Sequence, residues 1–321
     1  MSTPIILDKD ALNSALTYIW RQYLTWSTTS RSYKNEVTRW RNRVLLLSVV
    51  GAILGTLSQQ LSLWESIPSW FTRTLGFLSG AALVLAAYFG KEVFSPDPET
   101  KAVRARAAAE AFKSEAYLLA TGTPPYDTAT TTEELFEKTE KVRKTVENIA
   151  ALPITPHERK KEVPSAPMSV DDYISQRVDQ QINEFFLPEA KANEKKVATS
   201  RALSFSLGAL AVVLGLLSAK YASVAGWIAV IGTITAAIAA RQYAGRYQFL
   251  IVSYQATAER LEWLKTRWDI ERKTQGGAAS PHRFILACEQ VLSTENSAWM
   301  AQWTKKADDS ASNIQPSVTS R

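Results

Sequence analysis

Four long apolar runs constrain this chain more than any other feature of its sequence. They occupy residues 44–63, 75–89, 203–219 and 224–240, and none contains a charged side chain. A helix needs about 20 apolar residues to cross the hydrocarbon core of a bilayer, and each run is at or just under that length. The sequence therefore predicts an all-α integral membrane protein with four transmembrane helices.

The composition agrees with this prediction once the chain is divided into apolar runs and remainder. The mean hydropathy of -0.13 averages the runs with segments rich in charged residues. The net charge of +6 does not indicate nucleic-acid binding, because many Arg and Lys residues flank the runs. Basic residues at such positions set orientation in the membrane and attract anionic lipid. We therefore expect the lipid bilayer, and no nucleic acid, as a partner.

The distribution of basic residues also predicts the topology. The loops between paired runs, residues 59–74 and 220–223, contain few positive charges, whereas the segments outside the pairs are long and basic. The positive-inside rule then places both termini and the central segment in the cytoplasm. The first ten residues lack a basic stretch followed by an apolar core, so no cleaved signal peptide is expected. We expect a multi-pass protein of the inner (plasma) membrane.

The two pairs of runs are near-copies of one hairpin. A shift of about 160 residues aligns 41–58 with 201–218 and matches Gly55 to Gly215 and Ser58 to Ser218. A shift of about 149 residues aligns the second helices of the two copies. We therefore predict a first two-transmembrane repeat at 1–152, a linker at 153–170, a second repeat at 171–306 and a disordered tail at 307–321.

Outside the runs, the periodicity predicts helices that extend into a cytoplasmic helical bundle. Residues 8–43 and 171–200 should run into the first and third spans, the latter with a bend near Pro188. Pro96 and Pro98 should end the second span, because proline interrupts a helix. The fourth span should continue without a break to about residue 272. Further helices are expected at about 101–119, 133–152 and 281–306.

Small and weakly polar residues form stripes along the apolar runs. Steps of three and four residues put them on one helix face, and small faces let helix backbones approach closely in lipid. The predicted helix-packing residues are Gly51, Gly55, Gly76, Gly80, Gly208 and Gly215. The alternative is that some of these faces line a pore in an oligomer. The candidate pore-lining residues are Ser48, Thr56, Ser206, Thr233 and Thr235.

Residues for catalysis or metal binding are scarce. Cys288 is the single cysteine and the chain has two histidines, which argues against a disulfide, a zinc site or a histidine-based catalytic centre. Glu110 and Glu259 occupy matching places in the two repeats, and we interpret them as ion-pairing rather than catalytic residues. No phosphate loop or hydrolase motif accompanies them. We expect no enzyme, no metal and no cofactor.

Three segments resemble a known family. RARAAAEAFKSEAYLLATGTPPY at 104–126 follows the first hairpin directly and is similar to the matching part of SLATT-type bacterial two-transmembrane domains and their uncharacterised relatives. Residues 171–197 and 288–303 resemble the flanking helices of the same domains. The resemblance implies a pore-forming or membrane-perturbing effector in bacterial defence, triggered by a partner protein that senses or makes a nucleotide signal. It implies no catalytic residues.

Two functions remain open at this point. The first is a homo-oligomeric pore or membrane-perturbing effector of the bacterial inner membrane, gated through its cytoplasmic helices. The alternative is a structural membrane scaffold that assembles partners and conducts nothing. The absence of charged side chains deep in the spans argues against a charge-coupled transporter.

Overall fold

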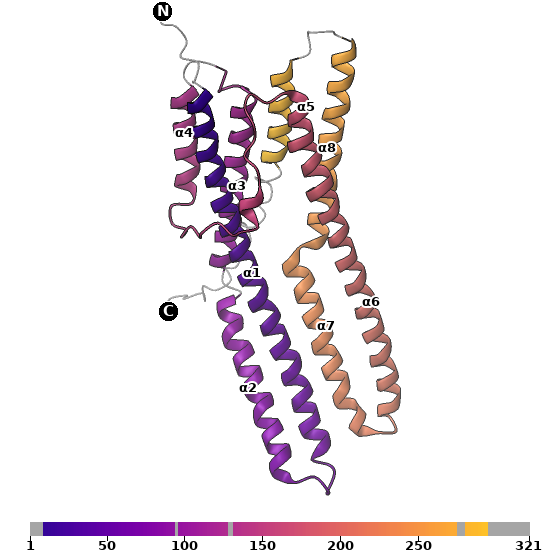
Figure 1. Ribbon diagram of the computed structural model, residues 1–321. Coiled ribbons are helices and arrows are strands. Elements are labelled where there is room, and N and C mark those ends of the chain that lie inside the picture. The colour runs from indigo at the N-terminus through magenta and orange to yellow at the C-terminus, as the bar shows by residue number, and fades with distance from the viewer. Residues whose placement is uncertain (1–8, 94–95, 128–130, 275–279, 295–321) are drawn as a thin grey trace, which may run out of the picture. The chain divides into compact units, whose positions relative to one another are not determined.

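The computed structural model describes residues 9–93, 96–127, 131–274 and 280–294 (Figure 1). Within these ranges the chain forms helices joined by turns, without a strand, so the prediction of an all-α fold is confirmed. Four of the helical segments are long and apolar enough to cross a membrane. The predicted tail at 307–321 lies outside the described residues.

The chain divides into two compact units. Residues 36–95 and 189–252 form one, here called the hairpin unit, and residues 1–35, 96–188 and 253–321 form the other, called the bundle unit. The predicted linker at 153–170 lies inside the bundle unit. The predicted repeat boundaries remain a prediction, because the spatial units combine segments from both halves of the sequence.

The hairpin unit consists of two helical hairpins (Figure 1). The end of α1 (Lys9–Leu61) pairs with α2 (Ser69–Val93). The end of α6 (Leu187–Ser218) is followed by the short 3-10 helix η4 (Ala222–Val224) and by α7 (Ala225–Gly245). The side-chain amide of Gln60 donates to the carbonyl oxygen of Ser223, so the two hairpins meet near their loops.

The prediction that the fourth span continues without a break is wrong. The helix α7 ends at Gly245, Arg246 adopts a left-handed conformation with φ 46°, and α8 (Tyr247–Thr274) starts immediately afterwards. A β-carbon at Gly245 would lie 2.5 Å from the ring of Tyr247. The break therefore depends on a glycine, which lets this ring approach the backbone. The pattern of apolar residues does not reveal such a local feature.

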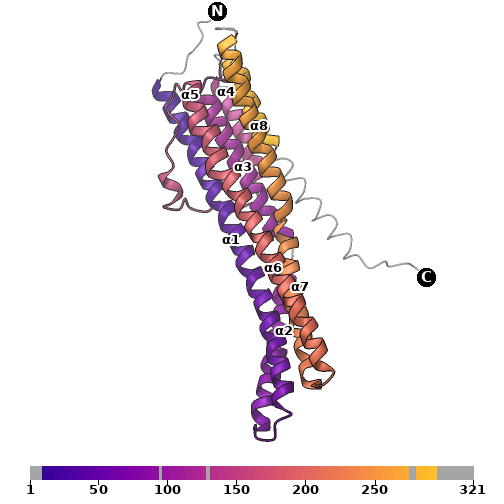
Figure 2. The same ribbon diagram turned by 90° about the vertical axis from the view of Figure 1, so that its right-hand side faces the viewer.

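The bundle unit packs helices from both halves of the chain (Figure 2). It contains the start of α1, α3 (Pro96–Ala120), α4 (Thr131–Thr145), α5 (Val170–Tyr173), the part of α8 from Ser253 onward and a helix at 281–294. Aromatic contacts connect them, and the ring centroids lie 6.0 Å apart for Tyr117 and Tyr173 and 6.3 Å for Tyr173 and Phe284. Trp20 of α1 lies 6.1 Å from Tyr117 of α3. Residues from both predicted repeats therefore pack in one continuous aromatic core.

Helix boundaries in the bundle unit follow ordinary capping rules. Pro96 and Pro98 fall in the first turn of α3, where a missing N–H costs nothing. At the other end Gly122 has φ 59°, and the N–H of Thr123 donates to the Leu118 carbonyl at 3.0 Å, the arrangement that closes many helices. The predicted helix at 133–152 is shorter than expected, because α4 ends at Thr145.

Residues 152–168, which include most of the predicted linker, are here called the connector, and they pack on α1. The indole N–H of Trp20 donates to the Lys161 carbonyl at 3.1 Å, and the backbone N–H of Leu152 donates to the Thr29 hydroxyl at 2.9 Å. Glu158, in the short 3-10 helix η1 (Glu158–Lys160), is fully buried and pairs with Arg31 at 2.9 Å. The connector is therefore held in place by partly buried polar contacts.

Candidate functional site

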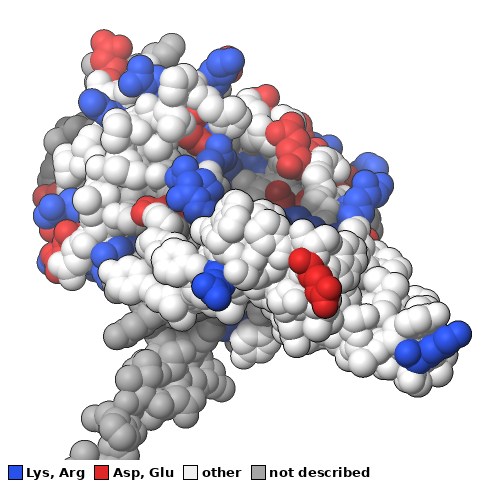
Figure 3. All heavy atoms as spheres, turned by 90° about the horizontal axis from the view of Figure 1, so that it is seen from below, with Lys and Arg blue, Asp and Glu red and all other residues white. Residues whose placement is uncertain are grey.

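The apolar part of α6 makes little contact within a single chain. Its buried residues, Ala190, Asn193 and Val197, all precede the apolar run. Phe205 is 80% exposed and Leu216 is 74% exposed. Seen from the loop ends of the hairpins, broad uncharged surfaces carry only isolated charged side chains (Figure 3). An exposed apolar surface of this length needs lipid or another protein to cover it.

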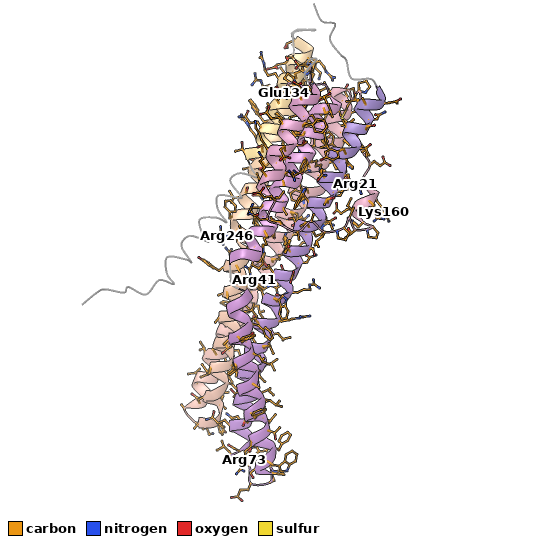
Figure 4. All side chains as sticks on the ribbon, turned by 90° about the vertical axis from the view of Figure 1, so that its left-hand side faces the viewer. Arg21, Arg41, Arg73, Glu134, Lys160 and Arg246 are labelled. Carbon is orange, nitrogen blue, oxygen red and sulfur yellow. The ribbon has the colours of Figure 1, made fainter. Side chains whose placement is uncertain are left out.

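Charged residues of the hairpin unit gather at its two ends. Arg41 and Arg246 lie at the end opposite the loops, and Arg73 lies at the loop end of α2 (Figure 4). The guanidinium of Arg43 stacks 4.9 Å from the ring of Trp40, which lies 5.2 Å from the ring of Phe89. Such aromatic and basic groups are typical of a membrane–water interface.

The six glycines proposed for helix packing fall into two groups. A β-carbon at Gly51 would lie 2.8 Å from Leu83, and one at Gly55 would lie 2.9 Å from the Ser79 hydroxyl. Ser79 also donates to the Gly51 carbonyl at 2.7 Å. A β-carbon at Gly76 would lie 3.3 Å from the Ser58 hydroxyl. In contrast, no atom lies within 4 Å of a β-carbon built at Gly80, Gly208 or Gly215.

This difference leads to a testable expectation for the packing role. Gly51→Leu should destabilise the first hairpin by about 1–3 kcal/mol, because the added side chain overlaps Leu83. Gly215→Leu should leave the stability of an isolated chain nearly unchanged. Denaturant titration of the two variants in the same detergent measures the effect. Equal loss in both variants would show that Gly215 also has a packing partner, which a second copy of the chain could provide.

Within a single chain the candidate pore-lining residues make local contacts. The hydroxyls of Ser48, Ser206 and Thr233 donate to the carbonyls four residues earlier in their own helices. The methyl carbon of Thr56 would lie 3.3 Å from a β-carbon at Gly226, at the contact between the hairpins. Thr235 is half-buried on α7. Their pore-lining role therefore stays a prediction that requires an oligomer.

A buried polar network in the bundle unit was not predicted from the sequence. Arg177 lies in the π-helical turn η2 (Ile174–Asp179), and its side chain is 1% exposed. Its Nε and Nη2 donate to the two carboxylate oxygens of Glu289 at 2.9 and 3.0 Å. The hydroxyl of Tyr173 donates to the same carboxylate at 2.9 Å. This network connects the segment after α5 to the helix at 281–294.

The network continues to α3 through Glu110, whose Oε2 lies 3.8 Å from Arg177 Nη1. Burial raises the pKa of Glu110, but the charges of Lys113, Arg177 and Arg106 outweigh burial and hold it below its usual value. Burial, reinforced by Arg177, lowers the pKa of Lys113 to about 8. Glu110 is therefore ionised at neutral pH. Lys113 is also protonated at that pH, although burial disfavours its charged form.

The two glutamates at matching places in the repeats are not brought together. Glu110 belongs to the network, as an ion-pairing residue, whereas Glu259 is exposed on α8. Burial raises the pKa of the Cys288 thiol, which disfavours the nucleophilic thiolate. Among the described residues no cluster of His, Cys, Asp and Glu could hold a metal ion. The network is therefore better suited to holding helices together than to catalysis.

The fold and the exposed apolar hairpins define a multi-span helical membrane protein. Residues 173–299 match the family model described as SMODS and SLOG-associating 2TM effector domain 1 (SLATT_1). Residues 23–134 match a model described as a protein of unknown function (DUF4231). The resemblance to SLATT-type domains and related two-transmembrane domains is thus confirmed. Comparison with curated proteins and with solved structures gave no match.

Proposed function

We propose that this protein is an effector of the bacterial inner membrane. It oligomerises through the hairpin unit and opens a pore, or disturbs the bilayer, when the bundle unit rearranges. The observation that carries the proposal is the uncharged, exposed surface of α6 in a chain that matches a two-transmembrane effector domain. Neither matched model describes an enzyme family, which favours a function without catalysis.

The proposal includes an orientation and a set of partners. Both termini and the bundle unit lie in the cytoplasm, which the positions of Arg41 and Arg246 opposite the hairpin loops support. An impermeant thiol reagent applied outside the cell should label a cysteine at Ser66 and spare one at Glu134. The partners are the lipid bilayer, further copies of the chain and a protein that delivers a nucleotide signal. This last partner rests on the family resemblance alone.

Ion flux from vesicles tests the pore directly. Val230 is 4% exposed on α7, and an apolar constriction at such a position closes a narrow pore by dewetting. Val230→Asn should raise the leak of a small ion from vesicles about five-fold or more, because a polar side chain keeps the constriction wet. The measurement uses purified protein reconstituted into vesicles of phosphatidylglycerol and phosphatidylethanolamine.

Val84→Asn on α2 is the matched control, since Val84 is 69% exposed, lies outside α6, and the chemical change is identical. This variant should leak no more than the parent protein. If the parent and both variants insert correctly and none of them conducts, the pore is excluded and the scaffold function takes its place.

A further inference from the structure

A cleft of about 280 Å³ lies beside Arg177 in the bundle unit. Its lining comes from α3, from the end of α4, from the π-helical turn that carries Arg177, and from the helix at 281–294. Ala107, Ala108 and Ala111 form a small apolar floor along α3, and Val142 and Leu292 add apolar walls. The cleft therefore offers a compact apolar surface next to a buried cation.

The guanidinium of Arg177 has an unused donor at this cleft. Its Nη1 is buried and has no hydrogen-bond partner among the described residues. The nearest carboxylate oxygen, on Glu110, is 3.8 Å away, which is beyond hydrogen-bonding distance. Buried guanidinium N–H groups are nearly always paired with an acceptor. An acceptor that enters the cleft would therefore complete the pairing of Arg177.

The three carboxylates that line the cleft already have positive neighbours. Glu110 faces Lys113, Arg177 and Arg106. Glu289 is held by Arg177 and Tyr173. Glu115 accepts a hydrogen bond from the Tyr126 hydroxyl and lies 3.6 Å from the ammonium of Lys138. Arg104, in contrast, directs its Nε to the neutral carbonyl of Thr145 at 2.9 Å. Arg104 and Arg177, together with the nearby Arg106, Lys113 and Lys138, outnumber these three carboxylates. This excess of positive charge makes the cleft suitable for negative rather than positive charge.

We propose that this cleft binds a small organic anion, a carboxylate with a compact apolar body. One carboxylate oxygen accepts from Nη1 of Arg177, with Arg104 as the second positive group, and the apolar body lies on the alanine floor. The π-helical geometry at Arg177 supports a binding role, since such turns occur frequently at functional sites. A bound anion would connect α3 and α4 to the helix at 281–294.

That connection would give the effector a means of regulation, and this consequence rests on the proposed function. The binding itself does not, because it is measured on the protein and not by conductance. A failure to bind would therefore leave the pore proposal untouched, and a failure to conduct would leave the binding site untouched.

Three ring compounds of similar size test the chemistry of the cleft. Benzoate carries the charge, benzamide is neutral, and benzylamine is positive at pH 7. Isothermal titration calorimetry on the full-length protein in detergent should give a dissociation constant for benzoate of about 1–10 mM, a reasonable value for so small a ligand. Benzamide and benzylamine should bind at least about ten-fold more weakly. Equal affinity of benzoate and benzamide would exclude the anion site.

Matched variants locate the binding. Arg104→Gln should weaken benzoate binding about five-fold or more, because it removes a lining cation. Lys160→Gln removes the same charge from an exposed position of the connector (Figure 4) and should have no effect. Ala111→Leu fills the floor of the cleft and should abolish binding. Benzoate affinity that survives Arg104→Gln unchanged would overturn the proposal, whether or not the Ala111 variant folds.

Discussion

Replacement of Glu289 by alanine is expected to lower the free energy of unfolding of the protein by about 3–5 kcal/mol. The substitution leaves the guanidinium of Arg177 buried without the two hydrogen bonds at 2.9 and 3.0 Å that it makes to the carboxylate. An uncompensated buried charge is among the most costly changes in a protein interior. Tyr173 also loses the acceptor of its hydroxyl. Urea unfolding followed by tryptophan fluorescence measures the loss.

The double variant Arg177→Met/Glu289→Leu is the control for this expectation. It removes both charges together, and apolar residues of similar volume often replace a buried ion pair without loss of stability. It should recover most of the stability that Glu289→Ala loses. A single variant that costs less than about 1 kcal/mol would show that Arg177 finds another counterion, with Glu110 at 3.8 Å as the nearest candidate.

The second large effect is expected at Lys113, where removal of a charge should stabilise the fold. Lys113 is 7% exposed, and burial together with Arg177 lowers its pKa from 10.5 to about 8. A shift of this size corresponds to roughly 3 kcal/mol of unfavourable interaction for the protonated form. Lys113→Met should therefore raise the free energy of unfolding at pH 7 by about 1–3 kcal/mol. Glu110 keeps Arg177 and Arg106 as positive neighbours in this variant.

The pH dependence of this effect has a definite sign. Between about pH 8 and 10.5 the unfolded chain holds the proton on Lys113 and the folded chain does not. Stability contributed by this group therefore rises with pH in that window and is lowest below pH 8. The difference in the free energy of unfolding between the parent and Lys113→Met should become smaller as the pH approaches 10. If the difference in the free energy of unfolding between parent and variant stays constant from pH 7 to 10, the pKa of Lys113 is not lowered in the folded chain.

Local patterns were sufficient to predict most of the helices. The spacing of Leu16, Ile19, Trp20 and Tyr23 predicts the amphipathic start of α1, and these residues are all buried. Pro96 and Pro98 predicted the boundary between α2 and α3. The match between 41–58 and 201–218 predicted two hairpins. All of these signals act over a few residues or over a repeat, which is the range that a single sequence makes visible.

The polar network lies beyond that range. Arg177 and Glu289 are separated by more than one hundred residues, and no sequence pattern near either residue indicates that the two interact. Arg177 and Phe186 are both buried because π-helical turns bring them to one side of the segment, whereas a period of 3.6 residues puts them on opposite faces. A charged residue buried in this way requires a buried partner. Similarly, the connector resembles a free linker in sequence, because two contacts that hold it, from Glu158 to Arg31 and from Leu152 to Thr29, involve distant residues of α1.

The packing of Tyr117 and Tyr173 against one another and against Phe284 has a consequence for biosynthesis. Phe284 leaves the ribosome more than 160 residues after Tyr117. At translation rates of 5–20 residues per second, the interval is roughly 10–30 s. During that time the aromatic and alanine-rich side of α3 lacks its final neighbour, while the first hairpin is already available for insertion. The nascent chain therefore exposes an apolar surface during this interval, and a holding chaperone has a defined period in which to act.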